Sequence, residues 1–475
     1  MKAEAPGGRP RTRPVPRVVI LAAGVGSRMR SSLPKVLHRV AGRTLLEAVL
    51  GAAERIHPSR IVVVVGAGRQ RVESSLEGRR VNFAVQDPPR GTGDAARRAQ
   101  EVLGPGEGPV LILAGDTPLL QPATLQALIE RRRRRDLDLV FLSFRPPEPG
   151  TFGRVVRDPR GRVVRIVEAA NASARERRIA EVNAGVYCFA PEALTRALAR
   201  LTRDHMSGEY YLTDGVAILA SRKGRVEAVE AEDWREAWGV NTRRDLSAAE
   251  EMERRRAVER ALDAGVTVLD PAAVRIGPRV VLQPDVVLHP FVSLEGDTVL
   301  EEGCEILSFT RLVDSHVAAG ATVGPHCEAD RAKIGARARV GPFSRLRPGS
   351  DIQEDARIGN FVETKNTIVR RGAKAQHLAY LGDADVGAGS NVGAGVITCN
   401  YDGEKKHRTT IGEGAFIGSD AQLVAPVSVG KGAYVGAGST ITEDVPDGAL
   451  ALSRVPQANV EGWVARRQEK KKKSE

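Results

Sequence analysis

Apolar residues recur at every sixth position through the second half of the chain. An α-helix does not have a period of six, and a single strand has a period of two. A short strand followed by a tight turn, stacked coil upon coil, gives this period in a parallel β-helix, where each repeating aliphatic side chain points inward. We therefore expect a left-handed parallel β-helix of hexapeptide repeats over residues 266–452. The repeating positions are Ile276, Leu282, Leu288, Leu294, Leu300, Ile306 and Leu312, then Val317 and Val323, then Ile334, Val340, Leu346, Ile352 and Ile358, and finally Ile411, Ile417, Leu423, Val429, Val435 and Ile441.

The first half of the chain has no six-residue period and instead alternates strand-like and helix-like segments. Helical patterns cover residues 44–55 and 124–134. Such alternation predicts an α/β domain with a Rossmann-like, mostly parallel sheet, which binds ligands at the carboxyl ends of its strands. The expected buried strands are residues 17–21, 61–65, 110–113 and 139–142.

The change of period divides the chain into domains. We expect a disordered extension over 1–16, an α/β domain over 17–243, a helical linker over 244–265 and a basic tail over 453–475, around the β-helix. Gly265 would stop the linker helix. The apolar side of that helix is Leu246, Ala249, Met252, Ala257 and Ala261.

Charge and cysteines narrow the class of protein. The net charge of +12 is concentrated at the ends, with net +4 in residues 1–17 and net +3 in residues 461–475. Because no nucleic-acid-binding motif accompanies it, we do not expect a nucleic-acid partner. The chain also has no signal peptide or membrane-length apolar run, so we expect a cytoplasmic protein without a membrane partner. The cysteines lack metal-type spacing and are expected to be free thiols: Cys188, Cys304, Cys327 and Cys399.

A glycine-rich segment directly follows the first expected strand. Gly24 and Gly26 allow backbone N–H groups to approach phosphate oxygens, because no Cβ intervenes. These glycines match a dinucleotide-binding fingerprint only in part, since Met29 stands at its third glycine. Arg28 and Lys35 add two cations that can neutralise a triphosphate and a departing pyrophosphate. The segment therefore indicates a nucleotide site.

Residues 21–29 (LAAGVGSRM) and 33–35 (LPK) resemble the signature of the sugar-phosphate nucleotidyltransferases. The resemblance implies that Arg28 and Lys35 are catalytic and that Gln86 reads a uracil base, whose edge its amide can pair with. It also implies that Asp116, at a strand end, and Asn241 hold Mg²⁺, a hard ion that prefers oxygen ligands. The implied UDP-sugar contacts are Leu21, Ala22, Ala23, Gly24, Lys35, Gln86, Gly91, Thr92, Ala114, Gly115, Asp116, Gly153, Glu168, Asn183 and Asn241.

The implied reaction is an in-line attack by a sugar-1-phosphate oxygen on the α-phosphorus of UTP, with release of pyrophosphate. This chemistry depends on positioning and charge neutralisation. Three positions depart from the family pattern: Ala114 stands for a tyrosine, Ala184 for a threonine and Asp94 for a histidine. These departures affect the finer contacts and the rate, not the type of reaction.

The six-residue period falters between about 359 and 410, where polar residues gather. Departures from a strong repeat are expected at functional sites. Arg347, Lys365 and Tyr380 supply phosphate-binding groups, and His377 is a candidate general base, although a lone histidine is more often structural. A set of three metal-binding histidines is an alternative for this fold, but no suitable spacing is present.

Stretches 341–349, 359–365, 377–383, 397–403, 419–426 and 453–457 resemble the acetyltransferase half of the bacterial bifunctional N-acetylglucosamine-1-phosphate uridyltransferases. The resemblance covers about residues 17–463. It implies a homotrimer that makes N-acetylglucosamine-1-phosphate from acetyl-CoA and glucosamine-1-phosphate, with His377 as base. UTP and Mg²⁺ then give UDP-N-acetylglucosamine. The implied ligands are Arg347, Lys365, Tyr380 and Asn391 for glucosamine phosphate, and Ala394, Asn400, Tyr401, Ser419, Ala437 and Arg454 for acetyl-CoA.

Two other functions are compatible with the same domains. One is a single-activity nucleotidyltransferase whose β-helix serves regulation or assembly. The other is a non-catalytic scaffold. Arg28, Lys35, Asp116 and Asn241 argue against the scaffold, and His377 with Lys365 and Tyr380 argues against the single activity.

Overall fold

The computed structural model describes residues 14–24, 26–205, 207–221 and 225–473. The chain divides into two compact units, Met1–Glu253 and Arg254–Glu475. Of the expected N-terminal extension, residues 1–13 lie outside the described ranges. Within those ranges no helix is both long and apolar enough to cross a bilayer.

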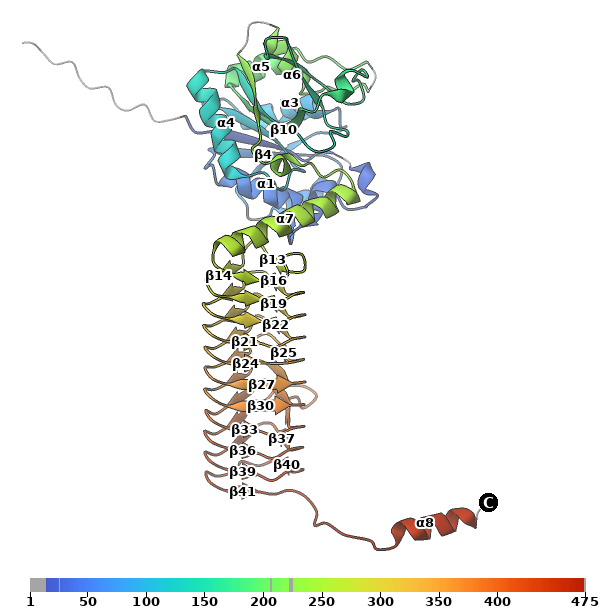
Figure 1. Ribbon diagram of the computed structural model, residues 1–475, viewed down its shortest axis with the longest axis vertical. Helices are drawn as coiled ribbons and strands as arrows, with labels where there is room; N and C mark the ends of the chain where they lie inside the picture. Colours follow the sequence, from blue (N-terminus) through green and yellow to red (C-terminus); the bar gives the residue numbers. More distant parts are fainter. Residues whose placement is uncertain (1–13, 25, 206, 222–224, 474–475) are drawn as a thin grey trace, which may run out of the picture. The chain divides into compact units, whose positions relative to one another are not determined.

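The first unit is built on one large sheet with the strand order β11-β7-β10-β6-β1-β4-β5 (Figure 1). β1 runs parallel to β4 and β6, and β7 runs parallel to β11, which confirms the mostly parallel sheet. β10, which the sequence analysis did not predict, lies antiparallel between β6 and β7. The strands are β1 (Arg17–Leu21), β2 (Arg39–Val40), β3 (Arg43–Thr44), β4 (Arg60–Val65), β5 (Asn82–Val85), β6 (Val110–Ala114), β7 (Leu139–Phe144), β8 (Arg154–Arg157), β9 (Val163–Val167), β10 (Val182–Phe189) and β11 (Val226–Glu230).

Helices cover both faces of this sheet. Val18 of β1 shares a core cluster with Leu46 of α1, whereas Val19 shares another with Ala99 of α3. This division follows from the alternation of side chains along a strand. Thr44 and Glu47 form a capping box that fixes the start of α1. The helices are α1 (Leu45–Glu54), α2 (Arg69–Ser75), α3 (Thr92–Leu103), α4 (Pro122–Arg135), α5 (Pro191–Leu198), α6 (Asp214–Ala220) and α7 (Arg243–Asp263), with short 3-10 turns at Ser27–Met29, Lys35–Leu37, Glu176–Arg178 and Trp234–Ala237.

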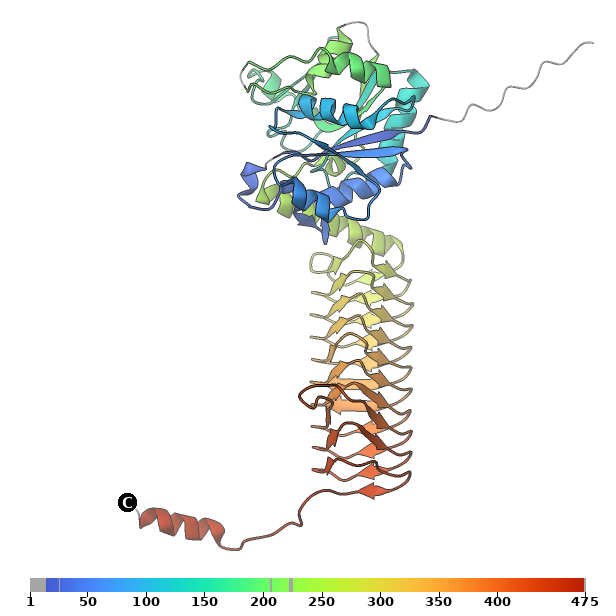
Figure 2. The same cartoon turned by 180° about the vertical axis from the view of Figure 1, so that it is seen from behind.

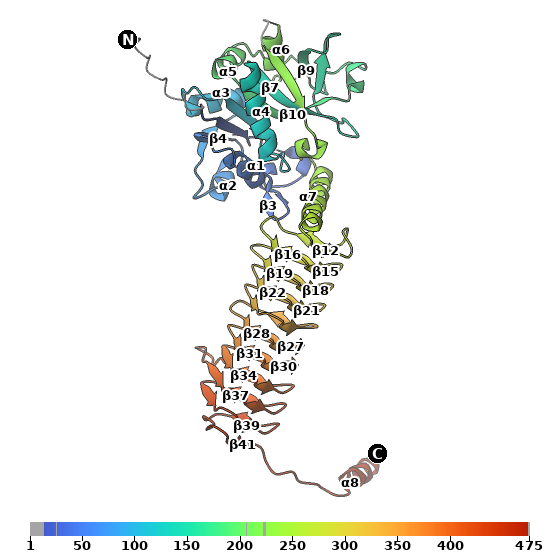
Figure 3. The same ribbon diagram turned by 60° about the vertical axis from the view of Figure 1, so that its left-hand side comes forward.

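The second unit is the predicted left-handed parallel β-helix. Its three parallel sheets run from β12 (Thr267–Val268) to β41 (Leu450–Ala451), from β13 (Arg275–Ile276) to β40 (Thr440–Ile441), and from β14 (Val281–Leu282) to β38 (Val427–Val429) (Figures 1 and 3). One coil corresponds to three hexapeptide repeats, since Val281 pairs with Val299 of the next coil. Leu288, Leu294 and Leu300 are at most 1% exposed, as the inward positions of the repeat predict.

The predicted interruption over 359–410 is wrong for residues 359–399. Asn360 pairs with His377 and Tyr380 with Ile397, each one coil further on, so the coils continue. The six-residue period is hard to recognise in this part of the sequence because small side chains occupy the inward positions. Thr364 and Ala375 are two of these, and both are fully buried. The real insertion follows β34 (Ile397–Cys399). It enlarges that coil, so that Ala384 pairs with Thr409 in the next strand of its sheet. The inserted residues 400–408 form a loop that leaves the regular stack (Figure 2).

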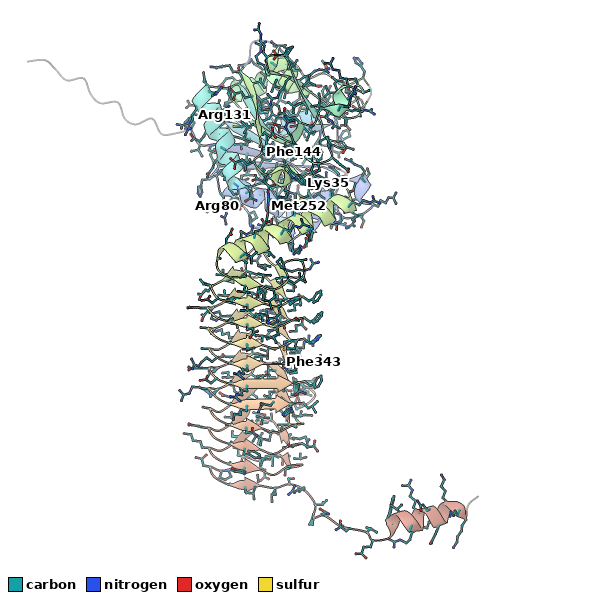
Figure 4. All side chains as sticks on the ribbon, viewed as in Figure 1. Lys35, Arg80, Arg131, Phe144, Met252 and Phe343 are labelled. Carbon is teal, nitrogen blue, oxygen red and sulfur yellow. The ribbon has the colours of Figure 1, made fainter. Side chains whose placement is uncertain are left out.

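One corner of the β-helix carries a stack of five rings, which we call the aromatic ladder. Neighbouring rings lie 4.7–5.4 Å apart, centre to centre. Its phenylalanines are about half exposed, and Figure 4 labels one of them, Phe343. Leu378, 61% exposed, continues the stripe in the next coil. The ladder consists of Phe291, Phe309, His326, Phe343 and Phe361.

Beyond β41 the chain loses regular pairing and then forms helix α8 (Trp463–Lys472). This helix is exposed throughout and carries the cations of the expected basic tail. The Arg467 guanidinium lies 5.0 Å from the centre of the Trp463 ring. The tail therefore contains local helical structure, which its charge-rich composition did not predict.

Candidate active sites

Four of the predicted residues converge at the carboxyl ends of the central strands in the first unit. The Lys35 ammonium forms an ion pair with the Asp116 carboxylate and lies 3.1 Å from Oδ1 of Asn241. Arg28 donates to the same oxygen at 3.0 Å. Figure 4 labels Lys35 in this region. Two cations and two oxygen ligands thus meet, although they come from distant segments of the chain.

Short local contacts hold these side chains in place. Asp116 follows β6 after Gly115, whose N–H donates to the Leu21 carbonyl at 2.9 Å. A Cβ on Gly115 would lie 2.8 Å from that oxygen. Gly26 adopts a left-handed φ of 66°, and a Cβ there would lie 2.6 Å from Cβ of Lys35. Only glycine permits both approaches.

Two of the converging groups, Lys35 and Asp116, line a cavity of about 500 Å³. It contains eleven of the predicted UDP-sugar contacts, from the glycine-rich turn, the base-reading segment and the end of β6. Gly115, Gly153, Asn183, Asn241 and Arg28 are not part of this lining. The eleven are Leu21, Ala22, Ala23, Gly24, Lys35, Gln86, Gly91, Thr92, Ala114, Asp116 and Glu168.

Gln86, at the other end of the cavity, is 3% exposed and so is not a surface glutamine. Its Nε2 donates to the Gly91 carbonyl at 2.9 Å and to Oδ2 of Asp94 at 3.0 Å. Gly91 has a φ of 95°, and a Cβ there would lie 2.6 Å from the Tyr210 carbonyl. The glycine-rich 91–93 segment is therefore required for close packing against the chain around Tyr210.

The residues expected at the sugar are grouped, but they are not equally available. Glu168 lines the cavity and accepts a hydrogen bond from Thr213 at 2.8 Å. Asn183 donates to the Tyr187 hydroxyl at 2.7 Å and accepts from the Gly185 N–H at 3.1 Å. Because these two hydrogen bonds engage its amide, Asn183 holds neighbouring residues in place and does not itself line the cavity. Gly153 lies beside Glu168, whose carboxylate oxygen would be 3.6 Å from an added Cβ.

In the second unit, His377 lies at the end of β30 (Lys374–His377), beside Asn360 of β27 (Arg357–Asn360). Its Nδ1 lies 3.0 Å from Oδ1 of Asn360. An amide oxygen only accepts, so this contact requires a proton on Nδ1, and in the neutral imidazole the lone pair is then on Nε2. The exposed imidazole thus has the tautomer that a general base needs.

A group of cations surrounds the adjacent strands β28 (Glu363–Lys365) and β31 (Tyr380–Gly382). Contact with Lys406 of the inserted loop, together with partial desolvation and nearby Arg347, lowers the pKa of Lys365. Arg347 donates to Glu363 at 2.9 Å. This concentration of positive charge suits a phosphate group.

Asp383 is the acidic centre of the same region. Burial acts to raise its pKa, but hydrogen bonds from Asn366 and Asn400, together with Lys365 and Lys406, leave the pKa lowered. Asn366 donates to Oδ1 at 2.7 Å and Asn400 to Oδ2. Asp383 thereby links the lysines to the buried Asn400 at the start of the inserted loop.

The remaining residues expected at acetyl-CoA follow one another along the β-helix. The Asp420 N–H, next to Ser419, donates to the Ala394 carbonyl at 2.7 Å. The Gly438 N–H, next to Ala437, donates to the Ser419 carbonyl at 2.8 Å. Arg454 donates to the Ala437 carbonyl at 2.8 Å. The contacts that link Ala394, Ser419, Ala437 and Arg454 form a continuous row. Tyr401, also expected at acetyl-CoA, is exposed in the inserted loop. Asn391, expected at glucosamine phosphate, begins β33 (Asn391–Val392), in the coil after His377.

The alternative of three metal-binding histidines is not supported. His289, His316 and His407 each contact a different carboxylate, those of Glu305, Glu301 and Asp402, and His326 belongs to the aromatic ladder. Among the described residues no group of three or more His, Cys, Asp or Glu side chains is arranged to hold a metal ion.

Comparison with known proteins decides the family. Residues 18–258 match the MobA-like NTP transferase domain, and residues 408–443 match the bacterial transferase hexapeptide (six repeats). The bifunctional protein GlmU of Sorangium cellulosum is 49% identical to this chain, covering 96% of it and 97% of the relative. The GlmU proteins of Bordetella parapertussis and Koribacter versatilis are 46% and 42% identical over 94% and 96% of this chain, and 98% of each relative. The chain belongs to the GlmU family.

As a member of the GlmU family, the chain is a bifunctional enzyme of UDP-N-acetylglucosamine synthesis. It transfers an acetyl group from acetyl-CoA to glucosamine-1-phosphate and a uridylyl group from UTP to N-acetylglucosamine-1-phosphate. A single-activity nucleotidyltransferase would catalyse one of these reactions and a scaffold would catalyse neither. Neither alternative therefore matches the bifunctional family.

The sequence analysis missed several residues that support the two sites. Asn360 contacts His377, and Asp383 and Lys406 interact with Lys365. Asp245 accepts from the backbone N–H groups of Asn241 and Thr242. Asp245 was predictable, since an acid shortly after Thr242 is typical of a helix start. Lys406 was not, because its contact with Lys365 depends on the path of the inserted loop.

The carboxyl of Glu168, in the wall of the cavity, makes the stability of the fold depend on pH. Burial raises the pKa of its carboxyl, helped by nearby Asp214 and Glu209 and opposed by the Thr213 hydrogen bond. A carboxyl whose pKa is raised on folding contributes its full stabilisation only when the pH is below its ordinary pKa in the unfolded chain. That contribution is lost as the pH rises through the raised pKa of the folded state. We expect Glu168→Gln to have a higher free energy of unfolding than the wild type at pH 8, with a difference that disappears near pH 4. Urea unfolding across this pH range measures it, with exposed Glu77→Gln as control; a difference independent of pH would contradict the account.

Proposed function

We propose that the cavity around Lys35 and Asp116, within residues 17–243, carries the uridylyl transfer, and that the corner around His377, within residues 266–452, carries the acetyl transfer. The observation that supports this most strongly is the convergence of Arg28, Lys35, Asp116 and Asn241 on one point of the first unit. No group of this kind is needed for an acetyl transfer.

For the uridylyl transfer, the glycine-rich turn and the two cations bind the triphosphate of UTP. The phosphate oxygen of the sugar attacks the α-phosphorus in line, and pyrophosphate leaves. Lys35 and Arg28 neutralise the negative charge that develops on the phosphates. Glu168 accepts a hydrogen bond from the sugar. Each of these roles needs position and charge more than covalent chemistry.

The oxygens of Asp116 and Asn241 fit a magnesium ion. Both contact the single Lys35 ammonium, so both can reach one shared cation. A carboxylate and an amide carbonyl, completed by substrate phosphates, form the hard oxygen set that Mg²⁺ prefers. When bound, the ion supplies charge neutralisation at the phosphates.

For the acetyl transfer, Arg347, Lys365 and Tyr380 bind the phosphate of glucosamine-1-phosphate. The sugar amine attacks the thioester carbonyl of acetyl-CoA and loses a proton to Nε2 of His377, and the thiolate of CoA leaves. Asn360 keeps the imidazole in the required tautomer. The row from Ala394 to Arg454 binds acetyl-CoA.

Hexapeptide repeats favour an oligomer, and we propose a homotrimer. The exposed aromatic ladder supports subunit contact, since a stripe of half-exposed rings is a typical interaction surface. Leu378, which continues this stripe beyond the ladder, directly follows His377, so a neighbouring subunit on this edge would border the acetyl-transfer site. We also propose that the protein acts in a reducing cytoplasm, which the four free cysteines support.

Removal of divalent metal tests the assignment. In the presence of excess EDTA we expect pyrophosphate release from UTP to fall by at least about 10²-fold, because the charge on the phosphates is no longer neutralised. CoA release from acetyl-CoA should stay unchanged, since His377 and its partners need no metal. Both rates are measured on the same protein. If EDTA stopped CoA release as well, or left pyrophosphate release intact, the assignment would be wrong.

A further inference from the structure

The hydrogen bonds of Gln86 define what it can offer a nucleotide base. A neutral amide has two N–H donors on nitrogen and an accepting oxygen. Both donors of Gln86 have partners within the chain, the Gly91 carbonyl at 2.9 Å and Oδ2 of Asp94 at 3.0 Å. Among the described residues no hydrogen bond is formed with its Oε1. Gln86 lines the cavity, so only an acceptor is available to the base.

The chemistry of the two partners fixes this orientation of the amide. A backbone carbonyl and a carboxylate are both acceptors only. If the amide of Gln86 turned over, its oxygen would face both of them, and two hydrogen bonds would be replaced by two repulsions. Gln86 is 3% and Asp94 8% exposed, so water cannot readily compensate.

Asp94 is itself held in place by the start of α3. It lies in the first turn of that helix, where a negative charge is stabilised by the helix dipole. Gly91 and Gly93, which precede it, pack against the Tyr210 segment, and the Gly93 N–H donates to the Tyr210 carbonyl at 2.7 Å. Asp94 is not part of the cavity lining and reaches the cavity only through Gln86.

We infer that Asp94 is a positioning residue that makes the site selective for uracil over cytosine, an inference that rests on the proposed uridylyl transfer in this cavity. Uracil presents an N3–H donor, which the Oε1 of Gln86 accepts. Cytosine presents a bare N3 acceptor at the same place, which faces the same oxygen. To serve cytosine, the amide would have to turn over against Asp94 and Gly91. By fixing the Gln86 amide, Asp94 thus disfavours the binding of cytosine as much as it favours the binding of uracil.

The nearly isosteric Asp94→Asn change tests this inference. Asn can present either a donor or an acceptor to Gln86, so the preferred orientation of the Gln86 amide is weakened. We expect the ratio of kcat/KM for UTP to kcat/KM for CTP to fall about 10-fold or more, which is the size of one charge-assisted hydrogen bond. Glu101→Gln makes the same type of change on an exposed residue of α3 and should leave the ratio unchanged.

Three measurements make the outcome decisive. CoA release by Asp94→Asn should equal that of the wild type, which shows that the second unit is folded, and retained pyrophosphate release from UTP shows that the first unit is folded. Gln86→Leu should reduce the UTP/CTP ratio to near one, and calorimetric binding of UTP and CTP should follow the kinetic ratios. A folded Asp94→Asn protein with an unchanged ratio would overturn the inference, as would an unchanged ratio in Gln86→Leu. A wild-type protein with no UTP turnover would instead refute the proposed function.

Discussion

Asp116→Asn is expected to lower pyrophosphate release from UTP by about 10³-fold. The substitution removes the carboxylate that pairs with Lys35 and with it the charge that, as proposed above, holds a divalent cation. The substitution should not collapse the site, because the Asn side chain fills the same volume as the Asp side chain that it replaces. Pyrophosphate release and CoA release should be measured on the same preparation, and CoA release should stay close to that of the wild type.

Asp136→Asn is the matched control for this prediction. Asp136 ends α4 with a left-handed φ of 49°, a conformation that Asn tolerates, and its side chain is 79% exposed. Both activities should be unchanged in it. If a folded Asp116→Asn protein kept its full uridylyl transfer, the cluster around Lys35 would not be the reaction site.

His377→Gln should have the opposite effect, a fall in CoA release of about 10²- to 10⁴-fold with uridylyl transfer unchanged. Gln can still donate to Asn360, but it has no basic nitrogen to accept the proton of the amine. The loss should appear in kcat more than in the KM for glucosamine-1-phosphate, because we propose that Lys365 and Arg347, and not His377, bind its phosphate. A steady-state assay of thiol release over a range of both substrates separates the two constants.

His316→Gln supplies the control, since this histidine lies on another coil of the same β-helix and contacts Glu301 at 2.8 Å. It should retain both activities. Equal losses in the two variants would show that histidines stabilise the coils and that His377 has no chemical role.

The fold followed from the sequence wherever the inward residues are large. Leu288 and Leu294 carry the six-residue period visibly and are buried, whereas Thr364 and Ala375 fill equivalent positions without an aliphatic signal. The coils persist there because stacking needs an inward side chain that fits and backbone pairing between coils, not a particular residue. The predicted interruption was therefore placed too early, and only the loop over 400–408 leaves the stack.

The candidate sites were predictable where one motif supplies the side chain and less so where partners come from distant segments. The glycine-rich turn, Lys35 and Asp116 were expected together, and the structure brings them together. That the amide of Asn183 is engaged by Tyr187, and that of Gln86 by Asp94, could not be derived, because hydrogen-bond partners depend on the register of packed elements. The orientation of a polar side chain depends on residues that are close in the folded structure but distant in the sequence.

The central claim is that one chain carries two independent reaction sites, and mixing the two variants tests it most directly. Glucosamine-1-phosphate, acetyl-CoA, UTP and Mg²⁺ are supplied, and formation of UDP-N-acetylglucosamine is followed by chromatography. Asp116→Asn alone and His377→Gln alone should form almost none, whereas an equimolar mixture should restore the product, because each variant performs the step that the other has lost. A mixture that remains as inactive as its components, with both variants folded, would contradict the account.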